Sequence, residues 1–253
     1  MTSWIVVSRT DHIDKHWRPR QDFEFAAKDQ VIEVLLSELS HVVTNFALGF
    51  IQKDGEYGLV ALLGLGDKRN LYVNQEGMWL SQYIPAVIRG YPFMLADNSE
   101  TGERMLCIEK GHLSDDSDAT ALFDDQDNLT NETAAVLNFL TQCDSSRDRT
   151  RIACNVLAEA GVIEPWQLEL KRSGDDKEPV SIKGVHRRNE SALNKLHEPT
   201  LVGLRDAGAL PLAYAQLYSM NLFGQLGKRK AYLIQQQENM KMAPKLDGFL
   251  AEE

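Results

Sequence analysis

Two apolar runs separated by a tight turn place the strongest constraint on how this chain can fold. Residues 46–51 and 57–66 are rich in aliphatic and aromatic side chains, and the sequence Lys-Asp-Gly-Glu lies between them at 53–56. Asp-Gly favours two-residue hairpin turns, in which both turn residues take positive φ. We therefore expect an antiparallel hairpin here. The run that ends at Gly66 is also far shorter than the roughly 20 apolar residues that span a bilayer.

Other segments predict strands and helices around this hairpin. Short aromatic or β-branched runs indicate strands, and apolar residues at spacings of three and four indicate amphipathic helices. The expected strands are residues 4–8, 23–27, 71–73, 78–80, 93–96, 105–109, 166–172 and 179–183. The expected helices are residues 31–43, 131–140, 144–160, 191–196, 199–207, 211–223 and 227–242. The chain should therefore be an α+β protein, with an antiparallel meander of hairpins covered by helices and a helical C-terminal third.

Single residues support several of these bounds. Thr130 is a suitable N-cap for the helix that follows it, and Gly161 is a suitable left-handed C-cap. Gly77, in the turn between two expected strands, can take positive φ because it has no Cβ. No repeat and no long Pro-rich or Ser-rich linker divides residues 1–253, so we expect a single domain. The acidic loop 114–128 is the alternative position for a domain boundary.

The charge of the chain restricts its partners. Lys and Arg number 27 against 37 Asp and Glu, which gives a formal net charge of −10. Such a charge opposes the neutralisation of phosphates by which proteins bind DNA and RNA, so we expect no nucleic-acid partner. The N-terminal sequence has neither the basic region nor the cleavage site of a secretory signal, and no apolar run is long enough to span a membrane. We therefore expect a cytoplasmic location, with leaderless export as the alternative.

Cysteine and histidine residues show no complete metal-binding or nucleophile pattern. Cys107, Cys143 and Cys154 follow neither a disulfide framework nor a CxxC spacing, so we expect reduced thiols. Glu38 and His41 have the Glu-x-x-His spacing by which helical bundles bind a di-iron centre, but such a bundle needs a second copy that the sequence lacks. A histidine at the margin of a core face is the simpler interpretation, and Glu38 with His41 is kept as an alternative metal site.

Other ligand-binding patterns are also incomplete. His12, Asp14 and His16 would project the same way along a strand and hold a transition metal with one further ligand, although an exposed polar loop explains them more simply. Residues 124–135 lack the glycine and the glutamate of an EF-hand loop. Neither residues 64–69 nor residues 224–228 have the spacing of a nucleotide-binding loop. We therefore expect no cofactor.

The most informative stretch is residues 70–93, in which aromatic side chains gather around a single cation. Aromatic walls with a fixed guanidinium can bind a carboxylate, a sugar or a peptide by stacking and bidentate hydrogen bonds. The alternative is an aromatic mini-core beneath a hairpin, with the guanidinium bonded to backbone carbonyls. The candidate ligand-binding residues are Asn70, Tyr72, Trp79, Tyr83, Arg89 and Tyr91.

The same stretch resembles the central motif of the SapC family of bacterial proteins. The resemblance lies in Asn-Leu-Tyr-Val at 70–73, Gly-Met-Trp at 77–79, Tyr-Ile-Pro-Ala at 83–86 and Arg-Gly-Tyr-Pro-Phe at 89–93. It continues, in the expected order, in Leu-Phe-Asp-Asp at 122–125, Ile-Glu-Pro-Trp-Gln-Leu at 163–168 and the ten residues 210–219. The resemblance implies a link to a paracrystalline surface layer, or to flavin-dependent tryptophan halogenases and outer-membrane uptake receptors, whose genes lie beside those of relatives. It implies no reaction and carries over no catalytic residues.

These observations leave hypotheses from different classes. The first is a non-catalytic binding or accessory protein that recognises a peptide, a sugar or a partner enzyme through the aromatic residues and Arg89. The second is an enzyme, metal-assisted in one form, that uses Glu38 with His41 or the segment containing His12 and His16. A structural component of a surface layer is the third. The sequence predicts no oligomeric state.

Overall fold

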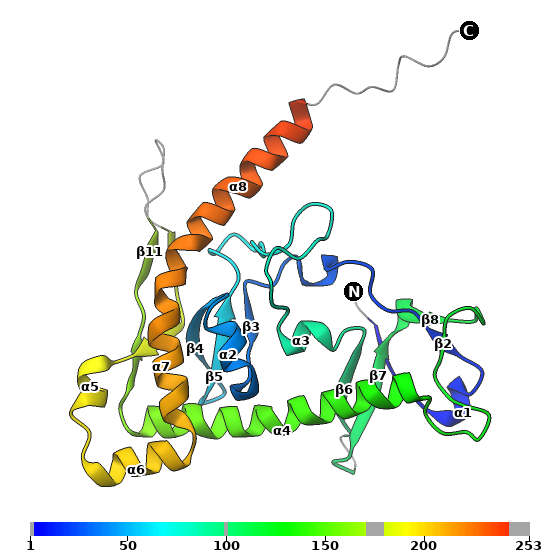
Figure 1. Ribbon diagram of the computed structural model, residues 1–253, viewed down its shortest axis with the longest axis horizontal. Helices are drawn as coiled ribbons and strands as arrows, with labels where there is room; N and C mark the ends of the chain where they lie inside the picture. The colour runs from blue at the N-terminus through cyan, green and yellow to red at the C-terminus, as the bar shows by residue number, and fades with distance from the viewer. Residues whose placement is uncertain (1–2, 99–100, 171–179, 243–253) are drawn as a thin grey trace.

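A five-stranded antiparallel sheet lies at the centre of the computed structural model, which describes residues 3–98, 101–170 and 180–242 (Figure 1). The strand order is β10-β13-β4-β5-β3. The bounds are β3 Val31–Glu33, β4 Ala47–Lys53, β5 Glu56–Leu62, β10 Ile163–Pro165 and β13 Val185–Arg188. The expected antiparallel arrangement is therefore confirmed.

The hairpin expected at residues 46–66 is formed by β4 and β5. The two strands pair from Ala47 opposite Leu62 to Lys53 opposite Glu56. Between them, Asp54 has φ 52° and Gly55 has φ 85°, as a turn with two positive φ angles requires. The turn chemistry and the apolar pattern thus agree, and this hairpin provides the central strands of the molecule.

Smaller sheets flank the central one. The expected pairing of residues 93–96 with 105–109 is confirmed, and so is that of 166–172 with 179–183, whose turn lies outside the described residues. The first flanking sheet has the order β1-β7-β6, the second β8-β2-β9, and the third contains β11 and β12. The bounds are β1 Trp4–Val6, β2 His16–Trp17, β6 Phe93–Asp97, β7 Arg104–Glu109, β8 Leu113–Ser114, β9 Thr120–Ala121, β11 Leu168–Leu170 and β12 Val180–Ile182.

One long helix, α4 (Asn131–Glu159), runs beneath both the central sheet and the β1-β7-β6 sheet (Figure 1). We expected two helices here, with a break near residues 141–143, and this prediction is wrong. No Gly or Pro interrupts the segment, and the hydroxyls of Thr141 and Ser145 donate to carbonyls four residues earlier, at 2.8 and 3.1 Å. Thr130 is the N-cap and Gly161 has φ 68°, as expected.

The C-terminal third is helical, as predicted. Its helices are α5 Glu190–Asn194, α6 Glu198–Asp206, α7 Ala209–Ser219, a 3-10 turn Met220–Leu222, and α8 Phe223–Met242. Helix α7 packs against α4 and β4, whereas α8 extends away from the body of the molecule (Figure 1). Among the described residues, no helix is long and apolar enough to cross a membrane.

Two further segments have a different secondary structure from the one predicted. Residues 31–43 were expected to form one helix, but residues 31–33 are strand β3, followed by a 3-10 turn Leu36–Glu38 and the single-turn helix α2 (Leu39–Val42). The β-branched Val31 and Ile32 pair with β5, so contacts distant in sequence override the local helical period. Residues 23–27 were expected to be a strand, yet Glu24–Ala26 is a 3-10 turn, begun where the Asp22 carboxylate accepts from the Glu24 backbone N–H at 2.9 Å.

The remaining short elements complete the fold. Helix α1 is Arg9–His12, helix α3 is Ala86–Arg89, and a 3-10 turn covers Lys110–His112. The hairpin expected between residues 71–73 and 78–80 is reduced to an isolated bridge between Val73 and Trp79, with Gly77 at φ 72°.

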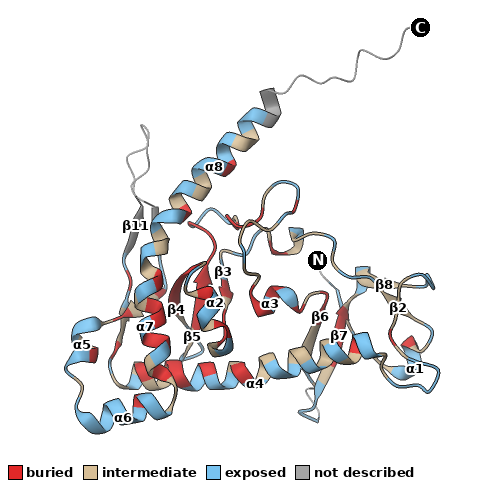
Figure 2. Cartoon of the chain, viewed as in Figure 1, coloured by how far each residue is buried: buried red, intermediate tan, exposed pale blue. Residues whose placement is uncertain are grey.

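Buried side chains form two hydrophobic clusters (Figure 2). The larger cluster lies between the central sheet and helices α4 and α7, and it contains Phe46, Phe50 and Leu157, all with no exposed surface. The smaller cluster, which includes Phe93 and Ile108, lies between the β1-β7-β6 sheet and the first half of α4. Ile32 of β3 and Ile88 of α3 belong to the larger cluster, and together with Phe93 of the smaller cluster they line a cavity at the seam where the two clusters meet.

Candidate functional site

The candidate site is built around the buried carboxylate of Glu38, which is the last residue of the 3-10 turn before α2. Glu38 is only 3% exposed. One of its oxygens accepts from the backbone N–H of Leu35 at 3.1 Å. The other accepts from the Tyr83 hydroxyl at 2.8 Å and from the backbone N–H of Ala86 at 2.6 Å. These bonds satisfy a buried charge and tie the turn before α2 to the start of α3.

Arg89, at the end of α3, lies beside this carboxylate. Its guanidinium is 4.0 Å from the Glu38 carboxylate and donates to the Tyr83 hydroxyl at 3.2 Å. The guanidinium carbon lies 5.5 Å from the centre of the Tyr83 ring and 5.0 Å from that of Phe139, distances at which a cation interacts with ring faces. The side chain is still 41% exposed, and the Tyr83 hydroxyl is its one hydrogen-bond acceptor among the described residues. The charge is therefore held in place with most of its N–H donors unused.

Tyr83 joins the two charged groups to His41. The imidazole of His41 stacks on the Tyr83 ring, with centres 4.9 Å apart and planes 10° from parallel. Burial, and then the hydrogen bond to Glu38, raise the pKa of the Tyr83 hydroxyl well above its usual value, because both disfavour a second negative charge. Tyr83 thus stays protonated and acts as a donor that fixes the carboxylate.

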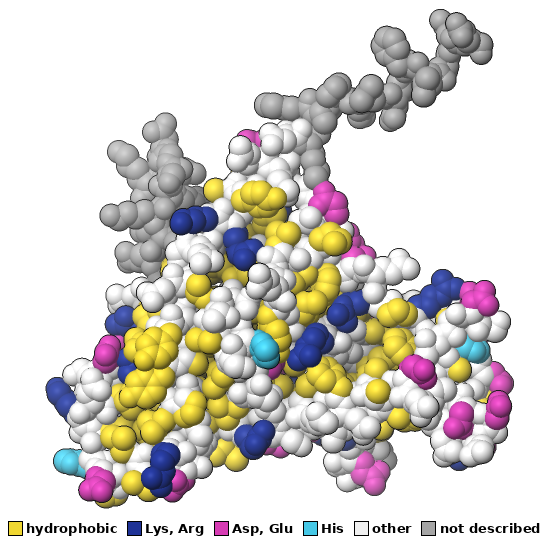
Figure 3. Space-filling view, in the orientation of Figure 1, with side chains coloured by type: hydrophobic (Ala, Val, Ile, Leu, Met, Phe, Trp, Pro, Cys, Tyr) yellow, Lys and Arg dark blue, Asp and Glu magenta, His cyan; other side chains and the backbone are white. Residues whose placement is uncertain are grey.

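These side chains form one wall of a cavity of about 620 Å³. Helix α4 supplies the opposite wall, which is mostly polar. Its lining residues are Phe139, Thr141, Gln142, Cys143, Ser145, Ser146 and Arg149. Arg149 is exposed and makes no ion pair with another described residue, so the cavity holds two arginines and one histidine against a single carboxylate. Figure 3 shows basic and histidine side chains near the middle of this face, over α2, α3 and α4.

The SapC family model matches residues 7–226, which include both walls of this cavity. The chain belongs to the SapC family. No curated protein and no solved structure matches it significantly. The resemblance seen in the sequence motifs is therefore confirmed over most of the chain.

Three of the candidate residues of this SapC protein do not line the cavity. Asn70 has no exposed surface; its amide donates to the Ala26 carbonyl at 3.0 Å and its oxygen accepts from the Tyr72 backbone N–H at 2.9 Å. The Tyr72 ring is 1% exposed. Trp79 packs beside it with ring centres 5.9 Å apart and donates to the Tyr83 carbonyl at 2.8 Å. These residues support the segment that carries Tyr83.

Tyr91 does not line the cavity beside Glu38 but lines a second cavity. Its ring stacks on Phe25 with centres 3.8 Å apart, and its hydroxyl lies 3.2 Å from Nε2 of His112. Of the six candidates, only Tyr83 and Arg89 line the cavity beside Glu38, and the structure adds Glu38 and His41, which the sequence had suggested only as an alternative metal pair.

The candidate metal ligands are dispersed. His12 is buried in α1, with Nδ1 3.2 Å from the Ser8 carbonyl, whereas His16 is in β2, so the two do not project along one strand as expected. Within the described ranges, no group of three or more His, Cys, Asp or Glu residues is placed to hold a metal ion. All three cysteines are free, and burial raises the pKa of the Cys154 thiol to about 12.

Sequence reasoning missed the wall formed by α4. Phe139 and Arg149 are far from Tyr83 along the chain, and nothing in their neighbourhood marks them as site residues. Hydrogen bonds of two hydroxyls hold α4 against the segment before α2. The Thr150 hydroxyl accepts from the Leu36 backbone N–H at 2.9 Å, and the Ser146 hydroxyl donates to the Ser37 hydroxyl at 2.9 Å. The available signal was a run of Ser and Thr in a helix, which is also typical of a solvent-exposed face.

Proposed function

We propose that this SapC protein is a non-catalytic binding or accessory protein, and that the Arg89 cavity takes the carboxylate of a peptide end or a peptide-like small molecule. The observation that carries the proposal is the state of Arg89. Two ring faces and the Tyr83 hydroxyl hold the guanidinium in place, while most of its donors face the cavity unpaired. A cation that is already ordered loses little entropy when it binds an anion.

The rest of the cavity fits an anion with a polar body. A guanidinium presents parallel N–H groups that match a carboxylate in a bidentate pair. Arg149 adds a second charge to the cavity, and the hydroxyl oxygens of α4, whose protons are already donated within the protein, can accept from amide N–H groups. The volume of about 620 Å³ lies in the range of small-molecule sites. Because the whole chain carries a net charge of −10, this basic cavity would attract anions locally against an acidic background.

Glu38 serves this site as a support and not as a ligand-binding group. Three donors already occupy its oxygens, and two of them are backbone N–H groups that fix the turn before α2 and the start of α3. Its charge also holds Arg89 near the mouth of the cavity at 4.0 Å. The carboxylate is thus committed to positioning Tyr83 and Arg89.

The proposal predicts that Arg89→Ala abolishes a preference for free carboxylates. The probe is a mixed library of N-acetylated tripeptides with free C-termini, compared with the same library amidated, and binding is measured by affinity selection and mass spectrometry. We expect the wild type to retain free-acid peptides selectively. Arg89→Ala should weaken them about 10- to 100-fold, because hydrogen bonds to charged groups contribute about 1.5–3 kcal/mol.

Two further variants make this test specific. Arg89→Lys keeps the charge and loses the planar fork, so it should bind with intermediate affinity. Arg151→Ala is the matched control, since Arg151 is an exposed arginine of α4 that pairs with Glu56 and does not line the cavity. Equal retention of free and amidated peptides by the wild type, or equal losses in Arg89→Ala and Arg151→Ala, would contradict the proposal.

A further inference from the structure

A second cavity, of about 600 Å³, lies in the seam between the two hydrophobic clusters. It is bounded by β3, α3, β6 and α4, with Trp4 of β1 and Phe25 at its margin, and Ala86 and Cys143 line both this cavity and the Arg89 cavity. Most of its wall is apolar. The apolar lining includes the aromatic rings of Trp4, Phe25, Tyr91 and Phe93 and the aliphatic side chains of Val87 and Leu140.

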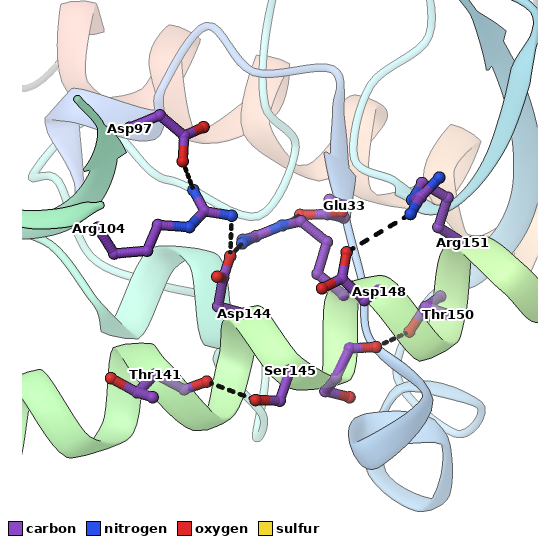
Figure 4. Close-up of polar contacts among 11 residues, drawn as sticks. Glu33, Asp97, Arg104, Thr141, Asp144, Ser145, Asp148, Thr150 and Arg151 are labelled. Atoms are coloured by element: carbon purple, nitrogen blue, oxygen red, sulfur yellow. Dashed lines mark hydrogen bonds and ion pairs between the residues drawn. The ribbon is translucent and has the colours of Figure 1, made fainter. Parts of the chain in front are cut away.

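Two of the three charged residues in the lining neutralise each other. Arg147 donates from Nε to Glu33 at 2.7 Å and from a terminal nitrogen to Asp144 at 2.9 Å. Asp144 in turn pairs with Arg104 at 2.9 Å, and Figure 4 shows these groups pointing toward one another above α4. The guanidinium of Arg147 is therefore committed to carboxylates of the protein and offers no free charge to a ligand.

The third charged residue, Asp29, has no such partner. Its carboxylate makes no ion pair and no side-chain hydrogen bond with any other residue that the structure describes, although it lines the same cavity. Asp29 is exposed at the margin of the cavity, and partial burial against the cavity wall raises the pKa of its carboxyl because no counter-charge offsets the lost water. The seam thus combines an apolar interior, four aromatic rings and one carboxylate at its margin that pairs with no other described residue.

We propose that the seam cavity binds an apolar ligand that carries a protonated amine. The ammonium group would pair with Asp29, and the apolar body would pack among Trp4, Phe25 and Tyr91. An ammonium–carboxylate pair supplies the charge-assisted hydrogen bonds that Asp29 lacks, and ring faces also attract cations. The site prefers the charge opposite to that of the Arg89 cavity and does not depend on the function proposed for that cavity.

The test compares three probes that share one apolar body. They are 4-phenylbutylamine, 4-phenylbutan-1-ol and 4-phenylbutanoate, which are cationic, neutral and anionic at neutral pH, and binding is measured by isothermal titration calorimetry on the full chain. We expect the amine to bind up to about fivefold more tightly than the alcohol, because an ion pair with an exposed carboxylate contributes up to about 1 kcal/mol, and we expect the carboxylate to bind least. Asp29→Asn should bring the amine to the affinity of the alcohol.

Controls separate this site from others. Asp125→Asn removes an exposed carboxylate away from the cavity and should leave all three affinities unchanged. Val87→Trp should weaken the amine and the alcohol about tenfold or more by filling the cavity, because Val87 lines it and is 46% exposed, so a larger side chain is tolerated. Unchanged thermal melting would show that each variant is folded. The proposal is overturned if no probe binds, if the alcohol matches the amine, or if Asp29→Asn or Val87→Trp leaves the amine affinity intact.

Discussion

Replacing Glu38 with alanine should lower the free energy of unfolding by about 3–5 kcal/mol, the loss typical when one partner of a buried charged network is removed. The backbone N–H groups of Leu35 and Ala86 and the hydroxyl of Tyr83 would lose their acceptor in a buried environment. Arg89 would lose its nearby counter-charge. Urea unfolding followed by circular dichroism measures the effect as a lower midpoint at an unchanged slope.

Two controls show whether the effect comes from these bonds. Glu56→Ala removes a carboxylate that is 50% exposed and pairs with Arg151, and such exposed pairs contribute only about 0–1 kcal/mol. Glu38→Gln keeps one acceptor oxygen but places an NH₂ group against an N–H donor, so its loss should be intermediate. If Glu38→Ala were no less stable than Glu56→Ala, the buried carboxylate would not be the support that we describe.

Asn70→Leu should be the second large loss, about 2–4 kcal/mol, because the buried Tyr72 backbone N–H loses its acceptor, at about 1–3 kcal/mol, and one further buried hydrogen bond is lost, at about 1 kcal/mol. The further bond is the one from the Asn70 amide to the Ala26 carbonyl, which still accepts from the Asp29 backbone N–H. Urea unfolding by the same method gives the comparison with Glu38→Ala.

Tyr72→Phe is the matched comparison for this region. It removes the hydroxyl that donates to the Asn45 carbonyl at 3.2 Å and keeps the aromatic ring, so the expected loss is about 1 kcal/mol. Peptide affinity measured well below the melting temperature should be the same in both variants and the wild type. An Asn70→Leu protein of normal stability that no longer binds peptides would instead place Asn70 in the binding surface.

Local chemistry was enough to predict the parts of the fold that depend on neighbouring residues. The hairpin of β4 and β5 follows from Asp54-Gly55, and the ends of α4 follow from Thr130 and Gly161. The segment 31–43 could not be predicted in this way. Its apolar residues fit a helical period, but β5 offers an edge to which Val31 and Ile32 add as a strand. Contacts with residues distant in the chain determine the secondary structure of such a segment.

In the candidate site, too, local sequence predicted some of the residues, and contacts distant in the chain determined the others. Tyr83 and Arg89 are six residues apart and were found because their types suit ligand binding. Asn70 and Tyr72 have equally suitable types, yet they lie in the core, since the property that makes an aromatic ring a good binding surface also makes it a good core residue. Phe139 and Arg149 reach the cavity only because α4 crosses beneath both sheets. No local sequence pattern predicts that α4 lies there.

The central claim is that the Arg89 guanidinium receives a ligand carboxylate. The most direct measurement is an NMR titration of the arginine Nε–Hε signals, assigned with Arg89→Lys and Arg149→Lys spectra, using a free-acid peptide selected from the library and its amide. We expect the Arg89 signal to shift with the acid in a saturable way and to stay fixed with the amide. An Arg89 signal that stays fixed while the acid binds would contradict the claim.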